Sequence, residues 1–166
     1  MNSLPHPDNA RLEAAQGWLE LDNPLEASEE LARISPENQT HPDVLEVLWR
    51  LNAKAKKWEE CMKVALELTT RTPERGLGWL QRAYGLHMLQ RTVEAREILL
   101  SVVDRFKTDA SVSYYLAFYC CKLGQLEEAR QWLRRAFRIA ASSGRRYLKL
   151  PALIETDLQS TWPTDR

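Results

Sequence analysis

Histidine and cysteine are the residue types in this chain with the widest range of chemistry, and each occurs three times. His87 and Cys121 are separated by 34 positions. A cysteine beside a histidine can act as a nucleophile with its general base, provided that the two side chains lie within hydrogen-bonding distance. The sequence supplies no recognisable third group to orient the histidine. We therefore expect His87 and Cys121 to line a surface and not to catalyse a reaction.

The other two histidines belong to a repeated triplet, His-Pro-Asp, at residues 6–8 and 41–43. This triplet is also the catalytic motif of the J-domain co-chaperones, where it lies in a loop between two longer helices. Here each copy comes directly before an amphipathic stretch. Proline suits the first turn of a helix because its missing N–H would have no partner there, and Asp in that turn complements the helix dipole. We interpret both triplets as helix starts, with Thr40 and Asp43 as a capping pair.

The motifs of the common enzyme classes are missing from the 166 residues. We find no phosphate-binding glycine loop, no His-Glu-x-x-His, no Gly-x-Ser-x-Gly and no paired-carboxylate pattern. Three cysteines, two of them adjacent, form neither a disulfide framework nor a zinc motif. We expect a reduced, cytoplasmic protein without enzyme activity, cofactor or metal. The sequence shows no secretory signal and no apolar stretch long enough to span a membrane.

Charge is balanced over the chain but unevenly distributed, with 23 acidic and 23 basic side chains in all. Residues 1–50 carry ten acidic and three basic side chains, and residues 51–166 carry thirteen and twenty. Nucleic-acid binding needs a basic surface, so the overall neutrality argues against it. The two ends are either solvated surfaces or steer a partner, which includes head-to-tail contact between copies of the chain.

Small residues recur every 34 positions. One register holds Ala27, Cys61, Ala95 and Ala129, and a second, twelve residues earlier, holds Ala15, Trp49, Ala83 and Ala117. Two amphipathic stretches with apolar residues at i, i+3, i+4 and i+7 fit within each period, separated by a turn of polar or helix-breaking residues. A single helical hairpin cannot bury its apolar side alone, so consecutive hairpins must stack.

This pattern resembles the tetratricopeptide repeat family, whose motif runs Trp-x2-Leu-Gly-x2-Tyr, then Ala-x3-Phe-x2-Ala, then Pro. The fourth repeat matches it best, with Leu116, Ala117, Gly124, Ala129 and Ala136. The resemblance implies an all-α fold, a right-handed α-α superhelix (solenoid) of about four 34-residue helix-turn-helix repeats plus a C-terminal capping helix. A single domain, 1–166, would hold repeats at about 8–40, 41–73, 74–108 and 109–142 and a capping segment at 145–159.

The second repeat departs from the family motif in two places. Trp49 stands where a glycine or alanine is expected, and Ala65 stands where a large aromatic residue belongs. Cores tolerate substitutions that conserve total volume. We expect the indole of Trp49 to fill the space left at Ala65.

In this family the first helices of the repeats line a concave groove that binds extended peptides or partner helices. Carried over by position, the groove residues of this chain include Arg50, Leu80, Tyr84, His87, Tyr114, Phe118 and Lys122. The aromatic ones are candidate anchors, because rings offer large rigid contact areas. The residues with which one subgroup clamps the C-terminal carboxylate of heat-shock chaperones are absent here. The C-terminal segment either caps the last repeat or occupies the groove.

The resemblance therefore implies a non-catalytic protein–protein interaction module: an adaptor, an assembly factor or a small chaperone. Its partner would be a protein or a peptide segment, held in the groove. The alternative is a structural repeat unit that self-assembles through its acidic N-terminal and basic C-terminal ends, which would make the protein a homo-oligomer.

Overall fold

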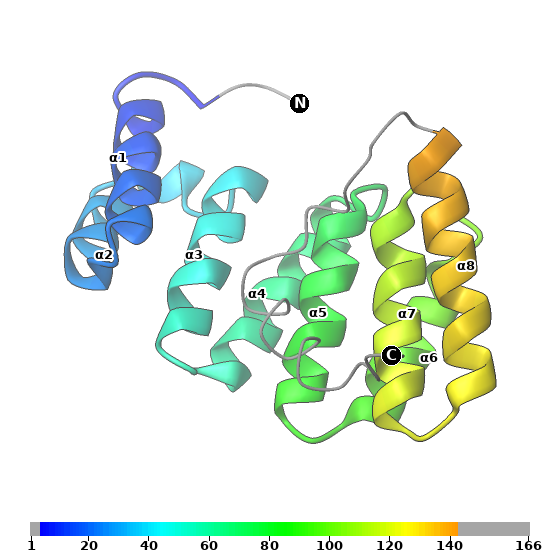
Figure 1. Cartoon of the computed structure of the whole chain (residues 1–166). Coiled ribbons are helices and arrows are strands. Elements are labelled where there is room, and N and C mark those ends of the chain that lie inside the picture. Colours follow the sequence, from blue (N-terminus) through cyan, green and yellow to red (C-terminus); the bar gives the residue numbers. More distant parts are fainter. Residues whose placement is uncertain (1–3, 143–166) are drawn as a thin grey trace. The chain divides into compact units, whose positions relative to one another are not determined.

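The computed structural model describes residues 4–142, and these residues contain eight α-helices and no strand (Figure 1). Helix starts follow the period of the sequence. First helices begin at Asp8, Pro42, Gly76 and Ala110, and second helices begin at Pro24, Trp58, Thr92 and Leu126, so both series advance by 34 residues. The predicted all-α solenoid of about four helix-turn-helix repeats is confirmed. The predicted capping helix at 145–159 lies outside the described residues.

The chain divides into two compact units, residues 1–85 and 86–166, each described by itself here. The first unit contains α1 (Asp8–Glu20), α2 (Pro24–Ala32), a short 3-10 helix (Pro36–Asn38), α3 (Pro42–Lys54), α4 (Trp58–Arg71) and most of α5 (Gly76–Met88). The second contains α6 (Thr92–Val102), α7 (Ala110–Lys122) and α8 (Leu126–Ser142). Hairpins form by contact of α1 with α2, α3 with α4, and α7 with α8, and α7 also packs on α6.

Each hairpin turn contains one residue in the left-handed region, again every 34 positions. These residues are Asp22 (φ 58°), Lys56 (φ 55°), Gln90 (φ 64°) and Gly124 (φ 75°). Glycine adopts this conformation easily because it has no Cβ, whereas in other residues the Cβ is crowded by the backbone. A backbone hydrogen bond closes the turn behind it: Asn23 N–H donates to the Trp18 oxygen, and Gln125 N–H to the Cys120 oxygen, both at 2.8 Å. The backbone conformation of the turn is therefore the same in all four repeats, although the residue type at this position varies.

The two His-Pro-Asp triplets both begin helices, as predicted. His41 is the N-cap of α3, and its Nδ1 accepts a hydrogen bond from the Asp43 backbone N–H at 3.3 Å. The prediction that Thr40 caps this helix is wrong, because the imidazole of the next residue takes that place. In the first triplet Pro7 precedes α1 without a side-chain cap. The carboxylate of Asp8 instead bonds to residues after α2.

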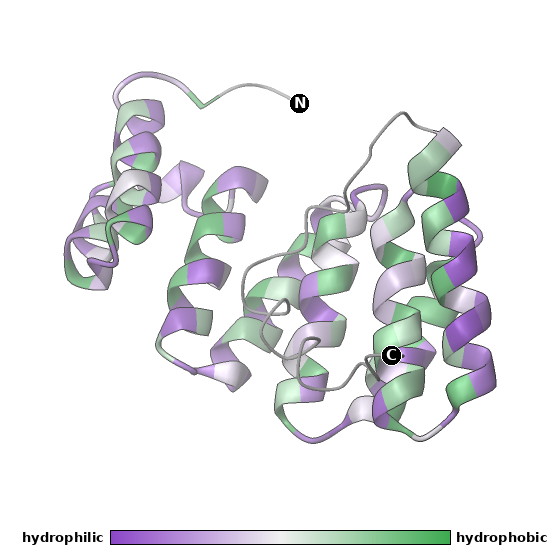
Figure 2. Ribbon diagram, viewed as in Figure 1, coloured by the Kyte–Doolittle hydropathy of each residue, from purple (hydrophilic) through white to green (hydrophobic). Residues whose placement is uncertain are grey.

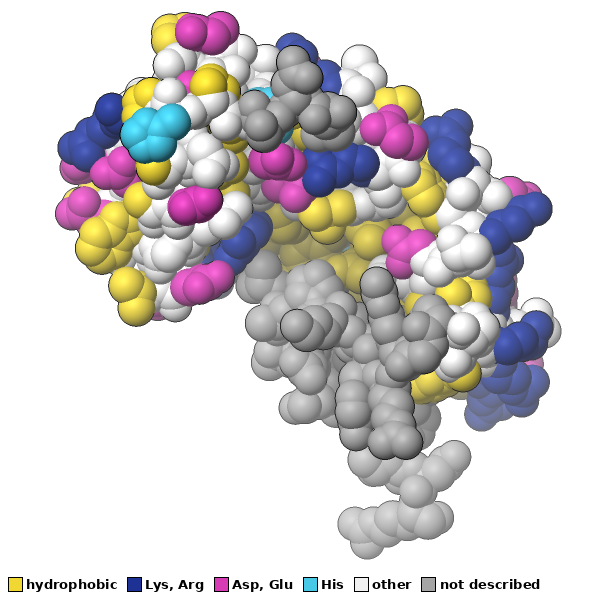
Figure 3. All heavy atoms as spheres, turned by 90° about the horizontal axis from the view of Figure 1, so that it is seen from above, with side chains coloured by type: hydrophobic (Ala, Val, Ile, Leu, Met, Phe, Trp, Pro, Cys, Tyr) yellow, Lys and Arg dark blue, Asp and Glu magenta, His cyan; other side chains and the backbone are white. Residues whose placement is uncertain are grey.

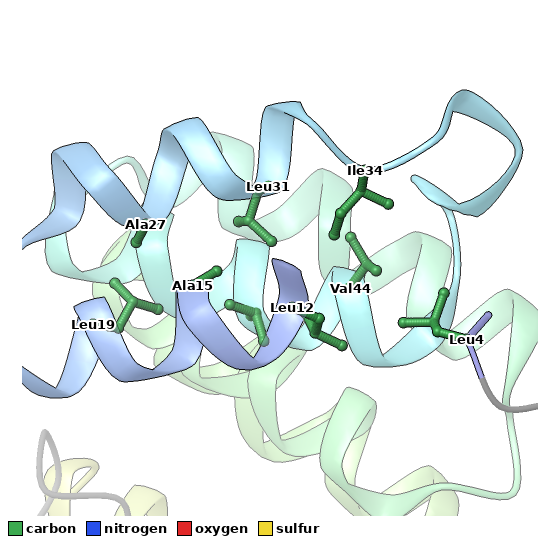
Figure 4. Close-up of a cluster of buried hydrophobic side chains, with 9 residues drawn as sticks. Leu4, Leu12, Ala15, Leu19, Ala27, Leu31, Ile34 and Val44 are labelled. Carbon is green, nitrogen blue, oxygen red and sulfur yellow. The ribbon is translucent and has the colours of Figure 1, made fainter. Parts of the chain in front are cut away.

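The core of the first hairpin is a cluster of small and branched aliphatic side chains. Leu12, Ala15 and Leu19 of α1 point towards Ala27 and Leu31 of α2 (Figure 4). Ala15 and Ala27 are both 0% exposed. Alanine carries only a methyl group, so helix backbones that meet at alanines can approach closely. The predicted role of the small residues agrees with this packing.

Candidate partner-binding site

The exposed side of α3 carries charged side chains at helical spacing. Asp43 and Glu46 are partly exposed and Arg50 is exposed, whereas Val47 and Trp49 are buried. Residues three and four positions apart are neighbours on a helix surface, so the three charged groups form one row. We call Asp43, Glu46 and Arg50 the charged row of α3.

Two carboxylates of this row share a single guanidinium. Arg75, in the connection between α4 and α5, donates to Asp43 at 3.0 Å and lies 3.2 Å from Glu46. Burial raises the pKa of the Glu46 carboxyl; the Arg75 charge opposes this shift, and the Asp43 charge adds to it. One cation does not neutralise two anions. A further basic group placed here would therefore be attracted.

Tyr84 of α5 lies in an aromatic cluster of the first unit. Its ring is edge-on to Trp49 of α3 and Trp58 of α4, with centroids 6.1 and 5.8 Å away. Tyr84 is 4% exposed, and Leu80 one turn earlier is 8% exposed. Edge-to-face contacts of this kind stabilise packed rings. Tyr84 thus serves the core that joins three helices of this unit.

Trp49 occupies the position in the second repeat where the family motif has a small residue. Its indole packs on Tyr84, and its backbone oxygen accepts a weak hydrogen bond from Cys61 Sγ at 3.7 Å. Trp49 Nε1 is buried without a hydrogen-bond partner in residues 4–142. The proposed exchange of volume between Trp49 and Ala65 stays a prediction.

Phe118 of α7 is the corresponding buried ring of the second unit, with 1% of its surface exposed. The His87 ring meets it edge-on at 5.2 Å, and the Tyr119 ring at 5.3 Å. The exposed Lys122 places its ammonium 5.3 Å from the Phe118 centroid, a cation–π contact. Phe118 therefore connects a buried aromatic cluster with an exposed positive charge.

The contacts of His87 are those of a packing residue. Its Nδ1 lies 2.9 Å from the Thr92 hydroxyl, and its ring touches both Phe118 and Tyr119. Cys121, its imagined nucleophilic partner, is partly exposed. These contacts hold the imidazole against α7.

Burial raises the pKa of two of the three thiols. The pKa of Cys61 rises to about 12, and that of Cys120 rises as well, despite a hydrogen bond from the Arg96 guanidinium. The thiolate is the reactive form of cysteine, and a raised pKa removes it at neutral pH. Cys61 and Cys120 are therefore structural residues.

A polar network connects the three helices of the second unit. Arg96 of α6 donates from Nε to Cys120 Sγ at 3.4 Å and from Nη2 to Glu128 of α8 at 2.5 Å. Trp132 Nε1 donates to the same carboxylate at 3.2 Å. These three hydrogen bonds tie α6, α7 and α8 to one another.

The structure separates the predicted groove residues by exposure. Arg50 and Lys122 are exposed, Tyr114 and His87 are half-buried, and Leu80, Tyr84 and Phe118 are buried in their own units. Sequence reasoning did not select Asp43 and Arg75 as site residues. The signal that could have found them is a pair of carboxylates three residues apart on a first helix, followed by an arginine after the next helix.

Residues 4–142 offer neither a metal site nor a membrane-spanning helix. No group of three histidine, cysteine or acidic side chains there is arranged to hold a metal ion. No helix in this part of the chain is long and apolar enough to cross a membrane.

Comparisons with known proteins support the fold. No family model and no curated protein matches the sequence. Solved structures of MamA share the architecture: one has a TM-score of 0.70 and 11% identity and covers 85% of this chain and 82% of that chain. A second has a TM-score of 0.68 and 11% identity, covering 87% and 79%. A third, MamA MSR-1 C2, has a TM-score of 0.65 and 16% identity, covering 82% and 78%. At such low identity the likeness concerns the fold.

Proposed function

We propose that this chain is a non-catalytic module of the tetratricopeptide repeat type that binds a protein or peptide segment along its first helices. The observation that carries the proposal is the charged row of α3. Asp43, Glu46 and Arg50 lie on the side of the helix that the core does not use, and Glu46 keeps its carboxylate in a partly buried place that disfavours the charge. Such charges can contribute to binding a partner, although they contribute little to the stability of the fold.

The charges indicate what the partner segment carries. A basic side chain suits Asp43 and Glu46: within residues 4–142 both pair with Arg75, and Asp43 also lies 3.8 Å from the His41 ring nitrogen. An acidic side chain suits Arg50, which has no ion-pair partner among residues 4–142. In the second unit an acidic group suits the exposed Lys122. Such alternation of charge gives a partner orientation and specificity more than affinity.

The buried members of the predicted groove have a supporting role in this proposal. Leu80 and Tyr84 are buried in the first unit and Phe118 in the second, and the half-buried His87 packs on Phe118. Substituting them would disturb the core as well as any contact with a partner. The exposed Arg50 and Lys122 are therefore better probes of binding. A cytoplasmic location belongs to the same proposal and is supported by three free cysteines in the described part of the chain.

The test begins with the full chain as bait, followed by mass spectrometry of the bound proteins. The identified partner is then titrated against R50E and K122E by isothermal calorimetry. We expect each reversal to weaken binding by at least about tenfold with an unchanged circular-dichroism spectrum. K107E, at an exposed lysine after α6, is the matched control and should bind normally. Full affinity in both R50E and K122E would remove the first helices as the site.

A further inference from the structure

One side of α8 presents arginines that folding does not use. Arg130, Arg134 and Arg138 follow each other at one-turn spacing on the exposed side, with Phe137 between them. Figure 2 shows hydrophilic residues along one side of this helix, and Figure 3 shows Lys and Arg side chains gathered over it. Arg130 pairs with Glu127 at 2.5 Å. Within residues 4–142, no carboxylate lies in ion-pair distance of Arg134 or Arg138.

Phe137 makes this side more than a solvated helix face. The ring is 58% exposed, next to the two arginines that have no ion pair within the described residues. Single exposed apolar residues are ordinary, but a large ring surrounded by like charges resembles the centre of an interaction surface, where aromatic and arginine side chains are enriched. We call Arg134, Phe137 and Arg138, with Arg130, the basic face of α8.

The turn between α1 and α2 has the opposite charge and its own exposed apolar residues. Leu21 is 73% exposed and Leu25 is 68% exposed. Glu20 precedes the first, and Glu29 lies one turn after the second; both are exposed. Within residues 4–142 the one ion pair of Glu29 is a long contact with Arg33, 3.4 Å between two exposed side chains. We call Glu20, Leu21, Leu25 and Glu29 the acidic tip.

We propose that the acidic tip of one copy of this chain docks on the basic face of α8 of a second copy. Both surfaces carry exposed apolar side chains beside charges that are mainly of one sign, basic on α8 and acidic at the tip. Glu20 and Glu29 supply the carboxylates that Arg134 and Arg138 lack. Burying the leucines against Phe137 removes apolar surface from water, and the charges steer the encounter. The inference goes beyond the proposed partner binding, because it uses neither the charged row of α3 nor Lys122.

The two surfaces predict a weak association that depends on salt. Each apolar contact consists of a few side chains, so electrostatic attraction provides much of the affinity, and salt screens attraction between exposed charges. The mean mass of the full chain, measured by sedimentation over a range of concentrations, should rise with concentration at about 25 mM salt and stay at the monomer value at about 500 mM.

A charge-swap experiment tests which surfaces meet. R134E/R138E gives a chain with two acidic surfaces, and E20K/E29K gives a chain with two basic ones. Each alone should associate at least about tenfold more weakly than the unmodified chain. An equimolar mixture should recover association, because each surface again meets its opposite. K57E/K107E, at exposed lysines elsewhere, changes the net charge equally and should associate normally.

Several results would overturn the proposal. A monomer at every concentration and salt would do so, as would a mixture that does not associate or a control that fails like R134E/R138E. F137A should weaken association and leave the melting temperature unchanged. If F137A lowers the melting temperature and leaves association as it was, the ring is covered within its own chain and not by a second copy.

Discussion

The first and last hairpins of the chain are built on one repeat but held together differently. In α1 a single stripe is buried: Leu12, Ala15 and Leu19, with Asp8 at its start. In α7 eight of the thirteen residues are buried, on every side of the helix. A helix that is apolar around its circumference lies inside a structure, and one with an apolar stripe lies at its surface. Contacts with both α6 and α8 enclose α7 within its unit.

The start of α1 depends on a buried carboxylate. Asp8 is 1% exposed and accepts hydrogen bonds from the Ser35 N–H and hydroxyl, both at 3.2 Å, and from Asn38 Nδ2 at 2.7 Å. These bonds connect α1 to the segment after α2. In α7 the buried rings of Phe118 and Tyr119 hold the helix in position by packing. A helix covered on one side needs directional bonds to fix its position, whereas an enclosed helix is fixed by shape.

The largest expected effect is that of a charged side chain at the enclosed helix. Ala117→Arg places a long cation in a site that is 1% exposed, so overpacking and an unpaired buried charge act together. We expect a loss of on the order of 4 kcal/mol in the free energy of unfolding, measured with urea and circular dichroism. Ala141→Arg, on the exposed side of α8, is the control and should change stability by less than about 0.5 kcal/mol.

The same substitution in α1 sharpens the comparison. Ala15 is also buried, but α1 is covered on one side only. We expect Ala15→Arg to open the first hairpin locally, with hydrogen exchange accelerated in α1 and α2 and protection kept in α7. If exchange accelerates equally in both hairpins, they unfold as one cooperative unit and do not differ in the way that α1 and α7 are held.

A cavity in the first hairpin should have the next largest effect. Leu19 is 1% exposed between α1 and α2, and Leu19→Ala should lower the free energy of unfolding by about 3 kcal/mol. Leu21→Ala, two residues later and 73% exposed, is the control and should stay within about 0.5 kcal/mol at high salt. A similar loss in both variants would mean that Leu21 is covered in solution.

The 34-residue period predicted the helices because the same weak pattern of small and apolar residues occurs four times along the chain. Small residues 34 positions apart determine where helices cross, and the helix starts follow the same interval. The left-handed turn residue could be predicted from the sequence at Gly124, because glycine favours positive φ. It could not be predicted at Asp22 and Gln90, whose residue types do not indicate that conformation. Geometry is conserved among these repeats where residue identity is not.

The candidate site was less predictable, because position on a helix does not determine exposure. Tyr84 and Phe118 stand at positions expected to face a groove, yet both are buried by rings from neighbouring helices. Those neighbours, such as Trp58 and His87, come from other elements, and one sequence does not reveal such contacts. The contact of Arg75 with Asp43 also joins two separate elements, the α4–α5 connection and α3. The capping function of His41 was missed because histidine is an uncommon N-cap.

The carboxylate clamp of α1 should make the first hairpin sensitive to acid. Hydrogen bonds, above all from Asn38, lower the pKa of Asp8 below its usual value, so the folded chain binds this proton less tightly than the unfolded chain. The stability that the clamp contributes is present above the unfolded pKa of about 4 and is lost as the pH falls through the folded value. Melting temperatures of the chain and of D8N should differ most at pH 7 and converge as the pH falls below about 4. E13Q, at an exposed carboxylate, is the control; a constant difference at every pH would show that the Asp8 charge is not involved.

The smallest effect should come from the hairpin turns, and it should have opposite signs in the two regions. Gly124 has φ 75° with nothing near its missing Cβ, so Gly124→Ala adds backbone strain alone and should lower the free energy of unfolding by about 1 kcal/mol. Asp22 holds the same conformation with a side chain, and Asp22→Gly should raise the melting temperature of the first hairpin. The substitution also removes the ion pair with Lys54, but Asp22 is 87% exposed there, and exposed pairs contribute little. Thermal melts of both variants measure the signs. A lower melting temperature for Asp22→Gly would mean that the first hairpin relies on the Lys54 contact across the turn, in the same way that its helix start relies on Asp8.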